Sequence, residues 1–222
     1  MQILPERRRS WSLGYQFSAL VPLLLIWTFT SVLLYASAAQ DKVPTERLFL
    51  DPATLSGEPW YTGLLHELGV LGWTVAATSA AAGAWVAAQS NRPRAVWFMA
   101  GGSVVTLLLL GDDITGFHSD VGIRLGIPKM ASIAGLLGIS GLWFVINWRE
   151  IRRTRWLTLI ASLAAFALSV LFDYERRDTS FNVFFEDAPK LLGIVGWATY
   201  FVLTAVDITR AIVRSRDGAA AA

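Results

Sequence analysis

Two histidines and several carboxylates stand where the sequence passes between apolar and polar segments. Imidazole and carboxylate groups bind divalent metals, and in a chain without cysteine they suit Zn²⁺, Fe²⁺ or Mn²⁺ better than Cu(I) or an iron–sulfur cluster. We therefore predict a divalent metal site. Its candidate ligands are His66, His118, Asp112, Asp113, Glu186 and Asp187.

Two further residues have side chains that would serve a reaction at this site. Glu67 directly follows His66 and is a candidate ligand or general base. Lys190 lies one helical turn after Glu186 and is a candidate charge partner or electrophile. The chain has neither His-Glu-x-x-His nor Glu-x-x-His, so the prediction rests on the expected convergence of these residues in space.

The Asp112–Asp113 pair is the strongest single signal. It follows 17 uncharged residues, at the expected C-terminal end of a helix, where carboxylates oppose the helix dipole and also repel each other. A positive charge should offset this cost. The candidates are a metal ion, a proton, Lys190, Arg124 or Arg176.

The elements that position these residues are predicted to be membrane-spanning helices. Hydrophobic residues make up 54% of the 222 residues and charged residues 16%, against about 25% charged in soluble domains. Backbone groups in lipid must bond within their own segment, so each long apolar run is a helix. This predicts an all-α, six-transmembrane-helix bundle. The spans lie roughly at 16–38, 62–88, 95–112, 128–147, 156–172 and 188–208.

The distribution of charge predicts the orientation of the bundle. Twelve of the 19 basic residues fall on the side of the termini and seven on the other, which places both termini in the cytoplasm of a cell whose inner membrane holds the protein. Thirteen of the 17 acids and both histidines fall on the outer side. We predict one integral membrane domain over 1–222, with a frayed tail at 218–222.

The first span has a second interpretation. An arginine cluster, an apolar run and Ala36-Ser37-Ala38 together are typical of a cleaved signal peptide. The apolar run is longer than a usual signal core, which favours a retained helix.

Small residues predict where helices approach closely. Ala76, Ala80 and Ala84 share one helix face, and glycines at 101–102, 135–141 and 193–196 add more small surface. Gly138 is expected to face a neighbouring helix.

Three functions remain open from sequence. The first is a membrane enzyme with a divalent metal, acting on a lipid-like or small substrate from the outer leaflet. The second is a proton- or cation-coupled transporter, although no ionisable residue lies in the middle of a span. The third is a structural or accessory subunit whose partners are other membrane subunits. A haem is disfavoured by the many carboxylates, and the basic residues predict a lipid bilayer rather than nucleic acid as partner.

Overall fold

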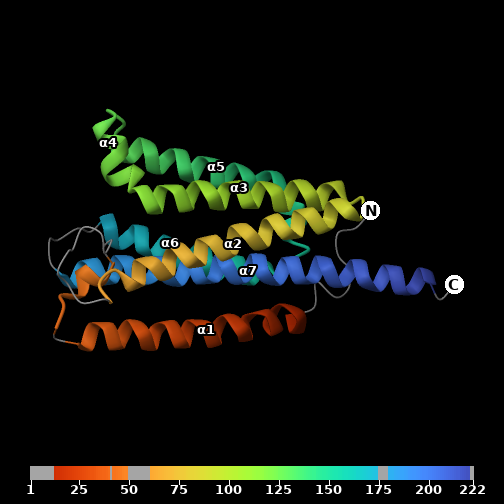
Figure 1. Ribbon diagram of the computed structural model, residues 1–222, viewed down its shortest axis with the longest axis horizontal. Helices are drawn as coiled ribbons and strands as arrows, with labels where there is room; N and C mark the ends of the chain where they lie inside the picture. Colours follow the sequence, from red (N-terminus) through yellow and green to blue (C-terminus); the bar gives the residue numbers. More distant parts are fainter. Residues whose placement is uncertain (1–12, 41, 50–60, 175–179, 221–222) are drawn as a thin grey trace.

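A computed structural model describes residues 13–40, 42–49, 61–174 and 180–220 as a bundle of helices with no strand among them (Figure 1). The elements are α1 Leu13–Ala39, η1 Thr45–Phe49, α2 Leu64–Gln89, α3 Pro93–Thr115, η3 Phe117–Val121, α4 Gly122–Arg124, α5 Lys129–Ile151, α6 Trp156–Tyr174 and α7 Ser180–Ala220. Each of the six predicted spans lies largely within one long helix, so the all-α prediction is confirmed.

Several of these helices mark the chain as a membrane protein. Within the described ranges, α1, α2, α3, α5 and α7 are long and apolar enough to cross a bilayer. Helix α6 has a shorter apolar segment, Trp156–Phe172. The count of six crossings and the cytoplasmic side of the termini therefore stay predictions.

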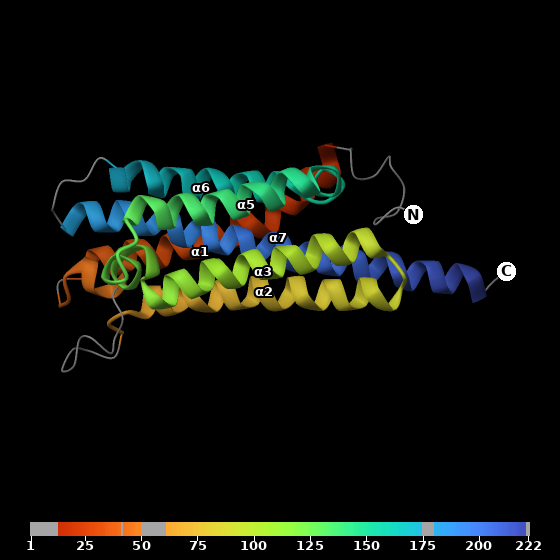
Figure 2. The same ribbon diagram turned by 90° about the horizontal axis from the view of Figure 1, so that it is seen from above.

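Helix α7 lies at the centre of the bundle (Figures 1 and 2). It packs along α6 and α2, and α1 lies against it on another side. Helix α3 packs on α2 and on α5. Helix α5 has little other contact with the bundle and is the least buried of the candidate spans. The residues on α7 are therefore those most enclosed by protein.

The bundle has two ends of different chemistry. We call the end that holds the connection from α3 to α5 the His118 end, and the end at which α6 begins the Asp207 end. The start of α1 and the end of α7 both lie at the Asp207 end (Figure 1). Helix α7 is helical through Ala220, and residues 221–222 of the predicted frayed tail lie outside the described residues.

An aromatic cluster fills the middle of the core. Trp73 stacks on Phe166 at a centroid distance of 5.6 Å, and Trp197 lies 5.9 Å from Trp143 and 5.4 Å from Phe201. The buried indole N–H groups have acceptors: Trp143 donates to the Phe98 carbonyl at 3.1 Å, and Trp197 to the Thr106 hydroxyl at 2.9 Å. A buried donor without an acceptor costs about 1–3 kcal/mol, so these bonds make the tryptophans compatible with the core.

Glycines permit close helix packing at some of the predicted positions. A Cβ atom added to Gly102 would lie 2.5 Å from the Phe201 ring, and one added to Gly193 would lie 2.7 Å from the Phe166 ring. The face of Ala76, Ala80 and Ala84 is also buried.

The expectation for Gly138 is wrong. No heavy atom lies within 4 Å of a Cβ added at Gly138, nor at Gly135 or Gly141. These glycines lie on the exposed face of α5, because α5 contacts the bundle through only one stripe of its surface.

Candidate functional site

At the end of α3 the chain turns back toward the last turn of the helix. Gly116 adopts a left-handed conformation with φ of 59°, which ends the α-helix, and Phe117–Val121 then forms a single π-helical turn. A side chain at position 116 would be strained in this conformation. Single π-helical turns occur frequently at functional sites. Here the turn brings His118 back over Asp112.

Asp112 and His118 form a closely matched pair. One oxygen of the Asp112 carboxylate accepts the backbone N–H of His118 at 2.9 Å, and the other lies 2.7 Å from Nδ1 of the imidazole. Because a carboxylate accepts hydrogen bonds, Nδ1 is the donor, and in the corresponding neutral tautomer Nε2 is left as an acceptor. The pair is part-buried, with 29% of the His118 side chain exposed.

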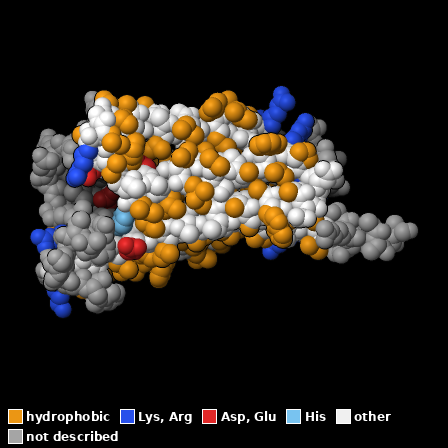
Figure 3. Space-filling view, turned by 45° about the horizontal axis from the view of Figure 1, so that its top comes forward, with side chains coloured by type: hydrophobic (Ala, Val, Ile, Leu, Met, Phe, Trp, Pro, Cys, Tyr) orange, Lys and Arg blue, Asp and Glu red, His pale blue; other side chains and the backbone are white. Residues whose placement is uncertain are grey.

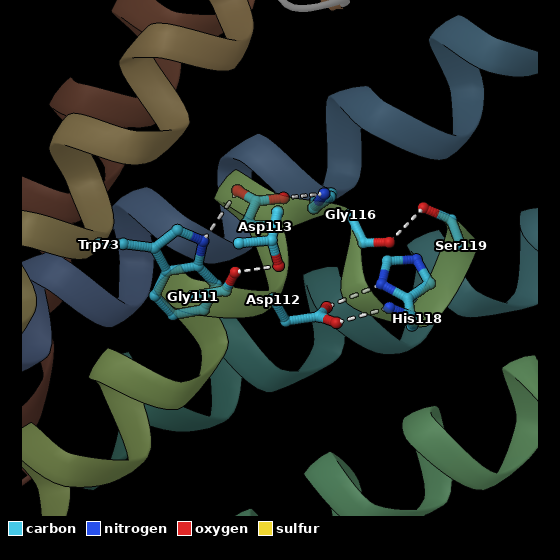
Figure 4. A network of polar contacts seen from close by, with 9 residues as sticks. Trp73, Gly111, Asp112, Asp113, Gly116, His118 and Ser119 are labelled. Carbon is cyan, nitrogen blue, oxygen red and sulfur yellow. Dashed lines mark hydrogen bonds and ion pairs between the residues drawn. The ribbon is translucent and has the colours of Figure 1, made fainter. Parts of the chain in front are cut away.

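Asp113 points away from its neighbour and has different partners (Figure 4). One of its carboxylate oxygens accepts the indole N–H of Trp73 at 3.2 Å, and the other pairs with the ammonium group of Lys190. The Asp113 side chain is only 8% exposed, whereas that of Lys190 is 36% exposed. Each of the two adjacent carboxylates therefore has its own partner, and the Lys190 ammonium supplies a positive charge beside Asp113.

The Lys190–Asp113 pair borders a small pocket between α2, α3 and α7. The polar residues that line it are His66, Asp113, Asp187 and Lys190, and the apolar ones are Leu65, Gly69, Leu191 and Ile194. Its volume is about 30 Å³, which is enough for a very few water molecules or a small cation. With His66 neutral, the described side chains that line the pocket carry one ammonium and two carboxylates, which is a net charge of −1.

Helix α7 lacks one backbone hydrogen-bond donor beside this pocket. Pro189 lies inside α7, between the two pocket residues Asp187 and Lys190. Proline has no N–H to donate to the carbonyl four residues earlier, so the helical ladder is incomplete at this point. The carbonyl four residues before Pro189 therefore lacks its usual helical partner, and α3 ends in the π-helical turn close to Asp113.

The predicted site residues fall into separate groups. His66, Asp113, Asp187 and Lys190 surround the pocket, whereas Asp112 pairs with His118. Glu67 is exposed and does not line the pocket, because successive helical residues point about 100° apart. The side chain of Glu186 lies outside the described residues.

The metal site with shared ligands stays a prediction. Among the described residues, no group of three or more histidine and acidic side chains is spaced to hold a metal ion. The compensating cation that motivated the prediction is present for Asp113 as Lys190. Arg124, another candidate cation, pairs instead with Asp120 at 2.8 Å.

Some residues of the site were not expected from sequence. Trp73 lies seven residues after His66, two helical turns along the same face, and this spacing could have indicated its place beside Asp113. At the other end of the bundle, Asp207 pairs with Arg155, the residue before α6, at 2.9 Å. No sequence spacing indicates this contact, because it joins residues 52 positions apart.

The surface agrees with a bundle that spans a bilayer. On the face shown in Figure 3, charged side chains gather toward the two ends and hydrophobic side chains cover the length between them. Fold and site together define a helical membrane protein with an ion-paired polar pocket at one end. The chain belongs to the family described as a domain of unknown function, DUF8692, whose model matches residues 18–204. No curated protein and no solved structure matches it.

Proposed function

We propose that the protein is a proton- or cation-coupled membrane transport protein whose ion-binding site is the pocket of His66, Asp113, Asp187 and Lys190. The observation that carries this proposal is the combination of size and charge. A small space of about 30 Å³ suits a small cation or a protonated water molecule, and a net charge of −1 attracts one proton or one small cation. Ionisable residues within membrane spans are functional by default because they are costly.

Lys190 acts in this proposal as a tethered cation that competes with the transported ion. Its ammonium interacts electrostatically with Asp113, Asp187 and Asp112. Any proton or cation that binds these carboxylates therefore weakens their attraction for the ammonium. The four-carbon stem of lysine lets the ammonium move toward water without unfolding the helix. Ion binding would then release α7 from the end of α3, next to Pro189, and shift the bundle between two arrangements.

A second candidate is a metal-dependent membrane enzyme, and one specific observation favours it. Metal-ligating histidines usually donate their other ring N–H to a carboxylate, as His118 does to Asp112. In this version Nε2 of His118 binds Zn²⁺, Fe²⁺ or Mn²⁺, Asp112 orients the ring, and the substrate is lipid-like or small. Glu67 remains the candidate base. The inner membrane is the predicted location in both versions.

The two candidates differ in which residues an ion needs. Purified protein would be reconstituted on a solid-supported membrane, and the charge displaced by jumps in H⁺, Na⁺, K⁺, Mg²⁺, Mn²⁺ or Zn²⁺ would be recorded. We expect one of these ions to displace charge in the wild type. Asp187→Asn removes the net charge of the pocket and should weaken binding about tenfold or more, which corresponds to about 1.4 kcal/mol or more.

The matched control is His118→Ala, which leaves the pocket intact and should keep the response. A response to Mn²⁺ or Zn²⁺ that is lost in His118→Ala and kept in Asp187→Asn would support the metal enzyme instead. If no ion displaces charge, the pocket does not bind ions. Its ion pair would then only hold α3 to α7, as in a structural or accessory subunit.

A further inference from the structure

The Asp207 end of the bundle is strongly basic. Among the side chains that the structure describes there, eight arginines outnumber two acids, which gives a net charge of +6. Figure 3 shows basic side chains at this end, on the right of the view. At the His118 end, the described side chains include five basic and five acidic groups, so that end is nearly balanced. The eight arginines are Arg92, Arg94, Arg149, Arg152, Arg153, Arg155, Arg210 and Arg214.

The connection from α5 to α6 holds the densest part of this charge. Four of the seven residues from 149 to 155 are arginines. Each of the two acids of this end binds one of them: Glu150 pairs with Arg153 at 3.3 Å, and Asp207 pairs with Arg155 at 2.9 Å. All four side chains are largely buried. The acids therefore offset the two inner arginines of this connection and not the two outer ones.

The two outer arginines, Arg149 and Arg152, are exposed beside an exposed tryptophan. The Arg152 guanidinium lies 5.8 Å from the centre of the Trp148 ring, which is within the range of a cation–π contact. The Trp148 side chain is 41% exposed. Basic residues at the end of α5 are favoured by the helix dipole, but the dipole does not account for a large apolar ring left exposed next to them.

Exposed tryptophans mark one level of the bundle near this end. They lie within about one turn of a helix end on three helices: Trp85 on α2, Trp97 on α3 and Trp148 on α5. Trp85 is 66% exposed and Trp97 is 77% exposed. Indole rings prefer the boundary between hydrocarbon and headgroups in a bilayer. The arginines, which follow at the helix ends and connections, therefore reach the layer that contains the lipid phosphates.

Two more arginines extend the basic surface along α7. Arg210 and Arg214 are exposed and are four residues apart, so they share one face of the helix. Like charges at this spacing destabilise a helix slightly, and the nearby acid Asp207 binds Arg155. An anionic partner on this face would offset the repulsion.

We infer that the Asp207 end is a binding surface for an anionic phospholipid, whose phosphate is held by Arg149 and Arg152 and whose upper acyl chains lie against Trp148. Guanidinium groups bind phosphate oxygens through pairs of parallel hydrogen bonds. Clusters of four to eight basic residues beside membrane helices are typical of surfaces that bind anionic lipids. The tryptophans favour a lipid over a soluble acidic partner, because the ligand must have an anionic part and an apolar part about one helical turn apart. This inference goes beyond the proposed function and does not depend on the ion pocket.

The experiment measures lipid binding to the purified, delipidated protein in a neutral detergent. Phosphatidylglycerol and phosphatidylcholine, each with a fluorescent acyl chain and an unmodified headgroup, would be titrated and followed by anisotropy at low salt. We expect the wild type to bind the anionic lipid about tenfold more tightly. The double variant Arg149→Gln, Arg152→Gln should lose most of this preference, because each basic residue near a lipid surface contributes to it. Lysine at both positions keeps the charge and should restore much of it.

The matched control is Arg124→Gln, which removes an exposed arginine at the His118 end and should keep the preference. Thermal unfolding should be unchanged in the glutamine variant, because both side chains are exposed. Inorganic phosphate at the concentration of the lipid should not displace it, since phosphate has no acyl chains to contact Trp148. Equal binding of the two lipids by the wild type, an undiminished preference in the glutamine variant, no rescue by lysine, or displacement by phosphate would each overturn the inference.

Discussion

Replacing Lys190 with methionine is expected to lower the free energy of unfolding by about 1–3 kcal/mol, because it leaves an enclosed carboxylate without its cation, while the 36% exposure of the Lys190 side chain lets water screen part of the loss. Asp113 is 8% exposed, and after the change only the Trp73 indole would still bond to it. Methionine retains most of the volume and flexibility of the lysine stem, so lost packing contributes little. Thermal or detergent-induced unfolding of the purified variant measures the effect.

The double variant Lys190→Met, Asp113→Leu removes both charges and should recover most of the lost stability. The exposed pair of Arg124 and Asp120 provides a comparison, because Arg124→Met should cost less than about 1 kcal/mol. If Lys190→Met has the same small effect as Arg124→Met, the Asp113 carboxylate is reached by water and does not depend on the ammonium.

Alanine at Gly102 and at Gly138 should change stability in opposite directions. At Gly102 the added methyl group meets the Phe201 and Trp143 rings of the aromatic cluster, which cannot move without disturbing their neighbours. We expect a loss of about 1–3 kcal/mol, or several degrees in Tm. At Gly138 nothing lies within 4 Å, and alanine should gain up to about 1 kcal/mol from its helix propensity.

Thermal unfolding of both variants in the same detergent gives the comparison. A destabilising Gly138→Ala would mean that the exposed face of α5 packs against another protein surface. A neutral Gly102→Ala would mean that the aromatic cluster is loose enough to accept a methyl group.

The helices could be predicted from sequence because the bilayer leaves few alternatives. Long apolar runs bounded by arginines or acids fix where helices lie, and α3 illustrates this with 17 uncharged residues before Asp112. The neighbours of each helix could not be predicted in the same way. Gly101, Gly102 and Gly138 look alike in sequence, but only the first two face aromatic rings, because tertiary packing decides which small residues meet a partner.

The residues of the candidate site could be predicted from the sequence, but not which of them pair with one another. The alternating direction of the helices is sufficient to place His66, Asp113, Asp187 and Lys190 near one level of the bundle. The pairing of Asp112 depends on the left-handed Gly116 and the π-helical turn that follows it, because this turn places His118 beside the carboxylate. No periodic pattern encodes that turn. Lys190 was one of several candidate cations for the two carboxylates, and the pairing of Asp112 with His118 emerged only from the folded chain.

The most direct test of the central claim is the affinity of the pocket for its ion when the tethered cation is removed. Lys190→Met changes the net charge of the pocket from −1 to −2, and the charge displaced on a solid-supported membrane would be titrated against concentration of the ion that acts on the wild type. If Lys190 and the ion compete for Asp113 and Asp187, the variant should bind about tenfold or more tightly, since a nearby unit charge is worth more than about 1.4 kcal/mol. Unchanged or weaker binding in a folded variant would contradict the account.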